Sequence, residues 1–227
     1  INGGTLNINY TTIDHNDIEG LRSQGGTIII DQSVIANNES QGLYRDSGEI
    51  TVSNTVIYHN GNNDAGSINY SYTNRQGSPP GGEGNITKDP WFVDSGSGDY
   101  HLLPGSVSIN RGDPAENDTD GTRRDMGRYI YEHTHFESEW HVSSDGDVLN
   151  GDGSSGNPLS SILAGVNLAN EGDEIIVSEG TYTGEGNHNI YFLGKGVTVS
   201  SSGEAENTVI DCENVNGDRG FVFEAHG

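Results

Sequence analysis

The chain has 227 residues and a formal net charge of −24, with 30% hydrophobic residues and 34 glycines. So acidic a surface repels nucleic acid and anionic lipid, because binding to either needs clustered lysine and arginine. No apolar run approaches the roughly 18 residues of a membrane-spanning helix. The single cysteine, Cys212, excludes a disulfide within the chain.

Three similar rows open the chain at a step of 22 residues, and they start at Gly3, Gly25 and Ser47. In each row apolar and polar residues alternate, which is typical of strands with one inward face. The stacked positions are Leu6/Ile28/Ile50, Ile8/Ile30/Val52, Thr12/Val34/Val56 and Ile13/Ile35/Ile57. A repeat this short leaves no room for a helix, so we predict an all-β, right-handed parallel β-helix solenoid with about 22 residues per coil.

Each row ends on an asparagine, at Asn16, Asn38 and Asn60. Asparagine tolerates left-handed dihedrals in tight turns, and asparagines stacked coil on coil bond one another through their amides. We therefore predict a structural ladder along these three residues. The alternative is that asparagine is merely common in this chain. His15, Asn37 and His59 share the preceding position, which we interpret as surface stacking.

After the third row the period loosens. One more strand is expected within residues 67–72, followed by a loop rich in glycine and proline. We divide the chain into C-terminal-half β-helix coils (1–75), a final coil with its closing segment (76–132), a linker (133–141), and an N-terminal cap with the first coils of the next β-helix (142–227).

The only helical pattern in the chain lies at 159–170, with Pro158 where helices begin and Gly172 at its end. Its apolar face holds Ile162, Leu163, Val166 and Ala169. Further strands are expected at 174–177, 197–199, 208–212 and 221–223. The helix is the one short capping helix of the predicted solenoid.

Two stretches resemble right-handed β-helix proteins of the pectin-lyase-like superfamily. Ser143–Gly184, with its helical pattern and Gly180-Thr-Tyr turn, is similar to the capping helix and first strand of that family. Residues 88–114 together with 120–129 resemble its last coil and closing segment. The resemblance implies the fold but no single activity, because the fold serves lyases, hydrolases, adhesins and structural proteins. We interpret the chain as a non-enzymatic, repeat- or filament-type member.

In this order, the end of one β-helix precedes the beginning of another. The chain is then one period of a tandem array, a subunit that completes its neighbours, or a circular permutant closed on itself. Closure is strained, because a nine-residue linker reaches at most roughly 30 Å and about eight or nine coils stack to about 40 Å. In the first two cases the unpaired end strands of one β-helix pair with those of the next, which gives a fibre. The predicted assembly ends are Ile1, Leu6, Ile8, Phe221 and Phe223.

A carbohydrate-active enzyme is the runner-up. The resemblance implies that such an enzyme would use clustered aspartates, or aspartate-bound Ca²⁺ with an arginine base, and the regular rows carry no carboxylate cluster. Arg22 and Arg45 could line a groove, but we interpret them as solvated turn residues. Gly184 stands where the pectinesterase pattern has glutamate. A third reading is an adhesin that binds glycans along the flank of the solenoid.

Four aspartates in a glycine-containing loop are candidate Ca²⁺ ligands, since hard cations prefer carboxylate oxygens. They are Asp113, Asp118, Asp120 and Asp125. The alternative is that they cap backbone amides in turns. Sequons for N-glycosylation occur at Asn9, Asn38, Asn69, Asn85 and Asn117.

We expect a structural extracellular or cell-surface protein that assembles head to tail into a filament or stalk. Its partner would be a copy of itself or the adjacent tandem repeat, with glycans as a further candidate. Nucleic acid and a membrane span are not expected, and Ca²⁺ is the one cofactor considered.

Overall fold

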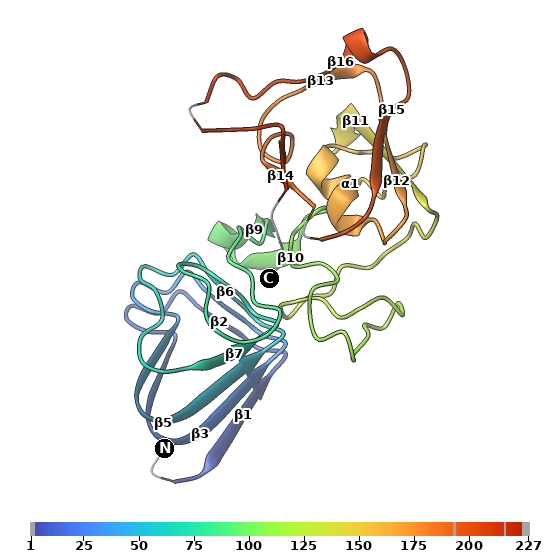
Figure 1. Ribbon diagram of the computed structural model, residues 1–227. Coiled ribbons are helices and arrows are strands. Elements are labelled where there is room, and N and C mark those ends of the chain that lie inside the picture. The colour runs from blue at the N-terminus through green and yellow to red at the C-terminus, as the bar shows by residue number, and fades with distance from the viewer. Residues whose placement is uncertain (1–2, 193, 216, 224–227) are drawn as a thin grey trace. The chain divides into compact units, whose positions relative to one another are not determined.

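The computed structural model describes residues 3–192, 194–215 and 217–223. The chain divides into two compact units, one of residues 1–102 and 106–132 and the other of residues 103–105 and 133–227. Across the described residues, strands dominate and a single short α-helix occurs (Figure 1). Parallel strands stack coil on coil, so the predicted all-β solenoid with about 22 residues per coil and one short helix is confirmed.

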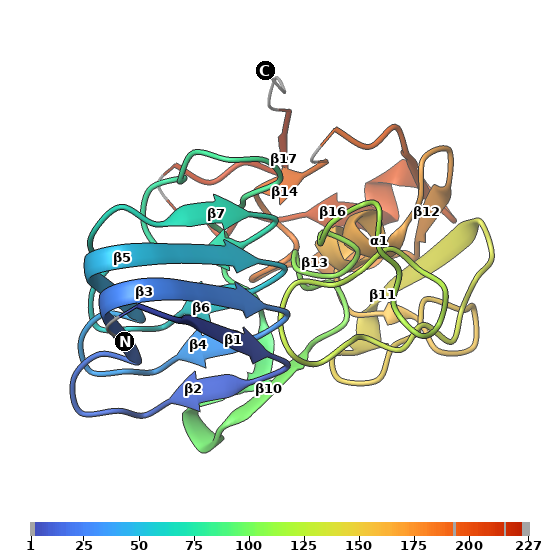
Figure 2. The same cartoon turned by 90° about the horizontal axis from the view of Figure 1, so that it is seen from below.

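The first unit is built on two parallel sheets that run along the stack. One sheet holds β1 (Thr5–Asn9), β3 (Leu21–Asp31), β5 (Leu43–Ser53) and β7 (Asn69–Ser71), and the other holds β2 (Thr12–Asp14), β4 (Val34–Ala36), β6 (Val56–Tyr58) and β8 (Asn74–Arg75). Figure 2 shows the arrows of the first sheet lying one above another. The pairing follows the predicted register, since Ile8 lies beside Ile30 and Ile30 beside Val52. The last coil is shorter than 22 residues, as the pairing of Val52 with Tyr70 shows.

Inward side chains of these strands form a narrow core. Its buried members are Ile28, Ile30, Ile35, Leu43, Ile50, Val52, Ile57 and Tyr70. Each coil adds only a few apolar residues to this column, and the loops remain in water. That is why a chain with 30% hydrophobic residues can fold.

Residues with positive φ make two corners of each coil. At the corner between the sheets, Tyr10, Gln32 and Asn54 have φ of 50°, 42° and 46°. At the corner after the second sheet, His15, Asn37 and His59 have φ of 51°, 52° and 56°. The ladder asparagines Asn16, Asn38 and Asn60 do not themselves have positive φ. The residue before each of them turns the chain, which leaves the asparagine side chain aligned along the stack.

A third face arises from a bend inside β3 and β5. The pairing of these strands shifts register between Ser23 and Thr27, where Gly25 and Gly26 have φ of 148° and 73°. Gly48, on the next coil, has φ of 81°, and a Cβ there would lie 2.4 Å from the carbonyl oxygen of Gly26. Glycine is required because both the dihedral and the close approach of the backbones exclude a side chain.

An antiparallel hairpin fastens the corners of the coils from outside. It consists of β9 (Phe92–Asp94), the short η1 (Ser95–Ser97) and β10 (Asp99–Leu102). The Tyr100 hydroxyl donates to Asp14 at 3.0 Å and accepts from Asn37 at 3.1 Å. His59 contacts Asp89 at 3.3 Å. The positions interpreted as surface stacking thus hold this part of the chain in place.

The segment after the hairpin covers the outer face of the second sheet. Val34 and Val56 point away from the coil interior, yet both are completely buried. Gly127 lies against them, and its backbone N–H donates to the carbonyl oxygen of Asn54 at 2.9 Å. The flank of the first unit is therefore closed by its own chain.

The second unit is a smaller three-faced solenoid. Its sheets are β11 (Glu139–Asp147), β12 (Glu174–Val177) and β15 (Thr198–Ser201); β13 (Gly180–Tyr182) and β16 (Thr208–Ile210); and β14 (Ile190–Tyr191) and β17 (Phe221–Val222). The described residues also include the short η2 (Ala205–Asn207) and α1 (Ile162–Leu168). The pairs formed by the described strands of this unit are parallel.

Several boundaries differ from the predictions; β15, β16 and β17 differ by one or two residues at their ends. The helix begins after Ser161, whose side chain accepts from the Ala164 N–H at 3.2 Å, so Pro158 does not start it. The predicted linker 133–141 ends inside a strand, because Glu139–His141 pair with Glu174–Ile176. Gly180–Tyr182 is the strand β13 rather than a turn.

Candidate assembly interface

The first coil exposes its apolar inward residues at one edge of the first unit. In the described sheets β1 and β2 have a strand neighbour on one side only. Leu6 is 38% exposed, whereas Ile28, directly beside it on the next coil, is 3% exposed. Ile8 is likewise only partly buried, and Ile30 beside it is completely buried. Ile1, the remaining residue predicted at this end, lies outside the described residues.

The asparagine ladder runs through the first unit in one direction. The Asn16 Nδ2 donates to the Asn38 Oδ1 at 2.7 Å, and the Asn38 Nδ2 donates to the Asn60 Oδ1 at 2.8 Å. The same oxygens accept the backbone N–H groups of Asn16 at 3.2 Å and Asn38 at 3.1 Å. Each oxygen thus takes two donors from the coil before it.

A second ladder of hydroxyl groups lies at the first corner. The backbone N–H of Thr11 donates to the Ser33 Oγ at 3.2 Å, and that of Ser33 donates to the Thr55 Oγ1 at 3.3 Å. Each of these hydroxyls donates in turn to a carbonyl two residues earlier, as Ser33 does to Asp31. Sequence reasoning missed this ladder, although Thr11, Ser33 and Thr55 recur at the same 22-residue step.

The opposite edge of the first unit closes both ladders with side chains. Gln76 ends the asparagine ladder, because its Oε1 accepts the Asn60 N–H and its Nε2 donates to the Asn60 carbonyl, both at 2.7 Å. Asn85 ends the hydroxyl ladder by accepting the Thr73 N–H at 3.0 Å. Ile86 also bridges to Asn74 alongside β8. One edge of this unit is therefore covered by its own chain, and the edge at β1 and β2 is bare.

In the second unit, α1 covers the edge at β11. Trp140 is 2% exposed and Val142 is completely buried, although β11 pairs with a strand on one side only. Gly165 of α1 packs so closely that a Cβ would lie 2.9 Å from Ile175 and 3.2 Å from Val142. Lys195 donates to the helix carbonyls of Val166 and Ala169 at 3.1 and 2.8 Å, which holds the C-terminal end of α1 in place.

The other edge of the second unit is formed by β15, β16 and β17, and no other strand of residues 3–192, 194–215 and 217–223 pairs along it. Ile175 and Ile190 are completely buried, but Val199 and Phe221, which pair beside them on the last coil, are not. Phe221 is 37% exposed and Phe223 is 80% exposed. The inward positions of the last coil are therefore more exposed than the same positions one coil earlier. The first coil of the first unit, at β1 and β2, shows the same difference from its neighbour.

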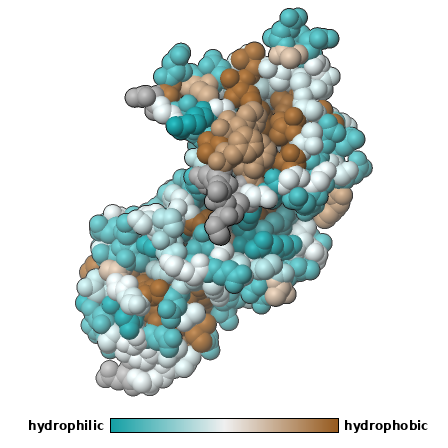
Figure 3. Space-filling model, viewed as in Figure 1, coloured by the Kyte–Doolittle hydropathy of each residue, from teal (hydrophilic) through white to brown (hydrophobic). Residues whose placement is uncertain are grey.

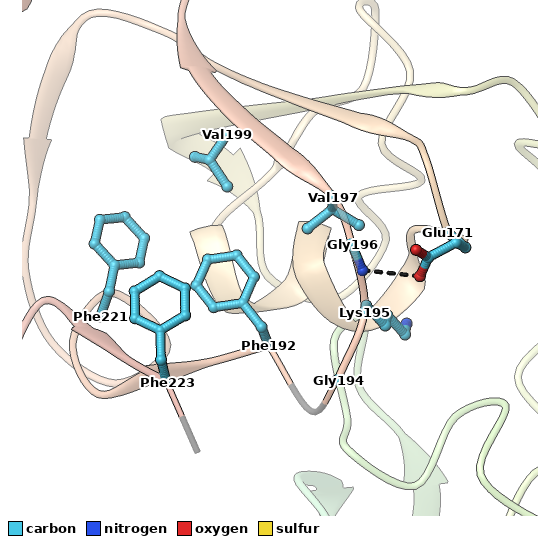
Figure 4. A pocket seen from close by; sticks show the side chains of 9 residues that line it. All are labelled: Glu171, Phe192, Gly194, Lys195, Gly196, Val197, Val199, Phe221 and Phe223. Carbon is cyan, nitrogen blue, oxygen red and sulfur yellow. Dashed lines mark hydrogen bonds between the residues drawn. The ribbon is translucent and has the colours of Figure 1, made fainter. Parts of the chain in front are cut away.

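A pocket lies at the edge formed by β15, β16 and β17. A pocket of about 640 Å³ is lined by Phe192, Val197, Val199, Phe221 and Phe223, with Glu171 and Lys195 at its polar side. Figure 4 shows the three phenylalanines grouped opposite the two valines. The Phe192 and Phe223 rings stack at 4.9 Å. In the space-filling view, hydrophobic residues gather on the surface of this unit (Figure 3). Two of its lining residues, Val199 and Phe221, pair beside the buried Ile175 and Ile190 of the preceding coil.

The four candidate calcium ligands are engaged with backbone amides. Asp125 is completely buried and accepts the N–H groups of Asn110 at 2.7 Å and Tyr131 at 2.6 Å. Asp118 accepts the Asp125 N–H at 2.7 Å. Asp113 and Asp120 accept N–H groups two residues ahead of them. Within residues 3–192, 194–215 and 217–223, no group of three or more His, Cys, Asp or Glu side chains is placed to hold a metal ion. The calcium site stays a hypothesis.

Burial raises the pKa of Asp125 to about 8, despite the two N–H groups that favour its charged form. Burial also raises the pKa of Asp118. Asp125 holds residues 110–131 together from a buried position, whereas Asp118 also lines a pocket on the flank of the first unit.

The five sequon asparagines differ in exposure. Asn9, Asn69 and Asn117 are exposed. Asn38 is buried, and its Nδ2 donates to Ala36 at 3.1 Å as well as to Asn60, so a glycan there would destroy the ladder. The Asn85 Nδ2 donates to Tyr70 at 3.1 Å and to Gly81 at 3.0 Å.

Arg22 and Arg45, which the sequence led us to interpret as solvated turn residues, instead lie in the strands β3 and β5, and they do not converge on a groove. Arg22 pairs with Asp46 at 2.9 Å and lies over the Tyr44 ring, whereas Arg45 donates to the Gly48 carbonyl. A different polar pocket of about 500 Å³ lies on the flank of the first unit, and its lining includes Tyr10, His101, Arg124, Arg128 and Tyr129. Sequence reasoning missed it, because its residues come from positions far apart in the chain.

No α-helix within the described residues is long and apolar enough to cross a membrane. A scan against protein-family models found no match, and neither did searches of curated proteins and of solved structures.

Proposed function

We propose that this protein is a structural β-helix subunit, or tandem repeat, that assembles head to tail into a filament or surface stalk. The edge at β15, β16 and β17 of one copy stacks on the edge at β1 and β2 of the next. What supports this is that each unit has one covered and one bare edge. The bare edges expose apolar inward residues, led by Phe221 on one and Leu6 on the other.

The geometry of the edges favours a second copy as the occupant. Unpaired strands at the end of a sheet accept further strands through their backbone groups. Both bare edges belong to stacks of parallel coils, so an incoming coil continues the stack. A head-to-tail contact uses two different surfaces and does not close on itself, which gives an open filament. The acidic, cysteine-poor composition and the exposed sequon asparagines fit an extracellular or cell-surface location.

Edge-specific variants test the assembly. Light scattering and negative-stain imaging of the 227-residue chain should show elongated particles that are multiples of 24.2 kDa. Leu6→Asp should block one edge and Phe221→Asp the other, so each variant alone should be monomeric. Mixed together, the two should form dimers through their intact edges and grow no further. Phe136→Asp is the matched control, because Phe136 is exposed and belongs to neither edge.

A wild-type chain that stays monomeric at high concentration would refute the proposal. Circular dichroism and melting curves establish that each variant is folded. Where Phe221→Asp unfolds the chain, Phe223→Asp replaces it, since Phe223 is the more exposed of the two.

Glycan binding is a second candidate, and the flank pocket favours it. Aromatic rings and arginine side chains, supplied here by Tyr129 and Arg128, are groups that contact sugars and their carboxylates. Arg128 lies over the Tyr129 ring at 5.0 Å. Calorimetry with neutral and uronate oligosaccharides, together with an assay for cleaved products, separates an adhesin from a polysaccharide lyase or hydrolase. Arg128→Ala should abolish binding in either case.

A further inference from the structure

The two units share one spacing of inward residues. In the second coil of the first unit, these residues follow one another by two, five and eight positions, at Ile28, Ile30, Ile35 and Leu43. One coil of the second unit repeats the same steps, at Ile175, Val177, Tyr182 and Ile190. Each of the eight side chains is at most 3% exposed. Because inward residues fill the interior of a coil, equal spacing around the three faces means that coils of the two units can stack on one another.

Strand pairing carries this spacing to both bare edges. On the first coil of the first unit, the residues that pair beside the buried set are Leu6, Ile8, Ile13 and Leu21. On the last coil of the second unit they are Val199, Ser201, Ile210 and Phe221. All eight are half-buried or exposed, and all except Ser201 are apolar. The two edges therefore present the same four inward positions.

The two edges also have the correct polarity for each other. In chain order β15 follows its neighbour β12, so the bare edge of the second unit lies where the next coil would be added. β1 precedes its neighbour β3, so the bare edge of the first unit lies where a preceding coil would be. The pairs on both sides are parallel. A copy stacked between these edges thus keeps the strand direction of both units.

We infer that the four inward positions of the last coil lie directly beside the four inward positions of the first coil in the next copy. This inference rests on the proposed head-to-tail assembly and adds its register. The pairs are Val199 with Leu6, Ser201 with Ile8, Ile210 with Ile13, and Phe221 with Leu21.

In this register β15 lies beside β1, β16 beside β2, and β17 beside the first residues of β3. Val199 and Phe221 line the apolar pocket at the edge of the second unit, so Leu6 and Leu21 of the next copy cover it. A shift of one residue would turn every inward side chain of the incoming strands outward, and a shift of two would displace the corners between the sheets.

Cysteine pairs on the outward side of the strands test this register directly. In a Cys212→Ser background, which removes the one native thiol, Thr5→Cys and Thr198→Cys are introduced together. Both threonines are exposed, and the register sets them side by side, at a spacing of about 5 Å that a disulfide bridges. Mild oxidation should give covalent dimers and larger species on a denaturing gel, with the 5–198 linkage identified by mass spectrometry.

The matched control is Asn7→Cys with Thr198→Cys. Asn7 lies on the same strand and the same outward face as Thr5, and it is also exposed. It is two residues out of register, which places the two Cα atoms roughly 8 Å apart, beyond the reach of a disulfide. The control pair should therefore cross-link far less than the 5–198 pair.

Asp211→Asn supplies an independent measurement. The register sets Asp211 of one copy beside Asp14 of the next, and like charges on neighbouring strands repel. Asparagine keeps the Oδ1 that accepts the Glu213 N–H at 2.8 Å. We expect the concentration for half-assembly to fall about two- to fivefold. Glu49→Gln removes one charge from an exposed position on β5, away from both edges, and should change that concentration less.

The outcomes separate the two proposals. Assembly of the wild-type chain in which the 5–198 pair cross-links no better than the 7–198 pair would overturn the register and leave head-to-tail assembly standing. Equal effects of Asp211→Asn and Glu49→Gln would also overturn the register. Circular dichroism establishes that the cysteine variants are folded, and the charge comparison does not depend on them. Absence of assembly by the wild-type chain would overturn both proposals.

Discussion

The side chain of Gln76 takes the place of a fourth ladder asparagine beside Asn60, since its Oε1 accepts the Asn60 N–H and its Nε2 donates to the Asn60 carbonyl, each at 2.7 Å. Gln76 lies 16 residues after Asn60, off the regular step. The stack is therefore closed by a residue from a loop that turns back over the last coil.

Gln76→Leu should lower the free energy of unfolding by about 1–3 kcal/mol, because it leaves the Asn60 backbone groups without partners in a largely buried place. Gln24→Leu is the control, because Gln24 is exposed and its amide is 3.4 Å from Asp46. The control should change stability by less than about 0.5 kcal/mol. Urea denaturation measures both, and equal effects would contradict the closing role of Gln76.

Asn38→Ala should lower the free energy of unfolding by about 2–4 kcal/mol. The substitution leaves hydrogen-bond donors and acceptors on both adjacent coils without partners. The Asn38 side chain contacts Asn16, Asn60 and the carbonyl of Ala36. Asn7→Ala on the exposed side of β1 is the matched control and should be nearly neutral. A loss below about 0.5 kcal/mol for Asn38→Ala would show that the ladder adds little to stability.

Gly48→Ala should lower the free energy of unfolding far more than Gly121→Ala does. Both glycines have positive φ, at 81° and 90°. A Cβ at Gly121 meets nothing within 4 Å, so its cost, about 1 kcal/mol, measures the dihedral strain alone. At Gly48 the Cβ would also strike the backbone of Gly26, and we expect a loss above about 3 kcal/mol. Thermal unfolding compares the two, and similar losses would refute a close backbone approach at this bend.

Stability should fall as pH rises from about 5 to 7.5, because burial raises the pKa of Asp125 from 3.8 to about 8. In this range the folded state holds a proton on Asp125 that the unfolded state has released. Raising the pH therefore favours unfolding, by up to about 1.4 kcal/mol per pH unit. Asp125→Asn should flatten the dependence measured by urea denaturation. Parallel pH curves for the two proteins would show that Asp125 ionises normally in the fold.

Assembly should strengthen with ionic strength. Copies with a net charge of −24 repel one another, and salt screens that repulsion while the apolar contact remains. Light scattering between about 20 and 500 mM NaCl should show growing particles for the wild-type chain. The Leu6→Asp variant should stay monomeric throughout. Dissociation on adding salt would instead indicate that charge pairing holds the copies together.

The sequence predicts the regular coils well, because their register depends on residues that recur locally. Leu6, Ile28 and Ile50 alternate with polar neighbours at a constant step, and their pairing follows that step. The ladder of Asn16, Asn38 and Asn60 is visible for the same reason. EIIV at 174–177 likewise forms β12.

Features that depend on tertiary contacts could not be predicted. The dihedral at Asn37 is set by the reversal of the chain, and its amide serves a hairpin whose Tyr100 comes 63 residues later. Glu139–His141 read as a linker because their strand partners lie 35 residues ahead, at Glu174–Ile176. Asn85 closes a ladder from within a loop, and no periodic signal marks it.

The one-way hydrogen bonding from Asn16 through Asn60 to Gln76 has a consequence for growth. In a fibre that continues this ladder, one tip presents the Oδ1 of Asn16, to which no described residue donates, and the other tip does not, so the two tips are chemically unlike. A short peptide that copies a single coil could therefore halt elongation at one tip and leave the other free to extend. Such a peptide would limit the length of the fibre without any change in the subunit itself.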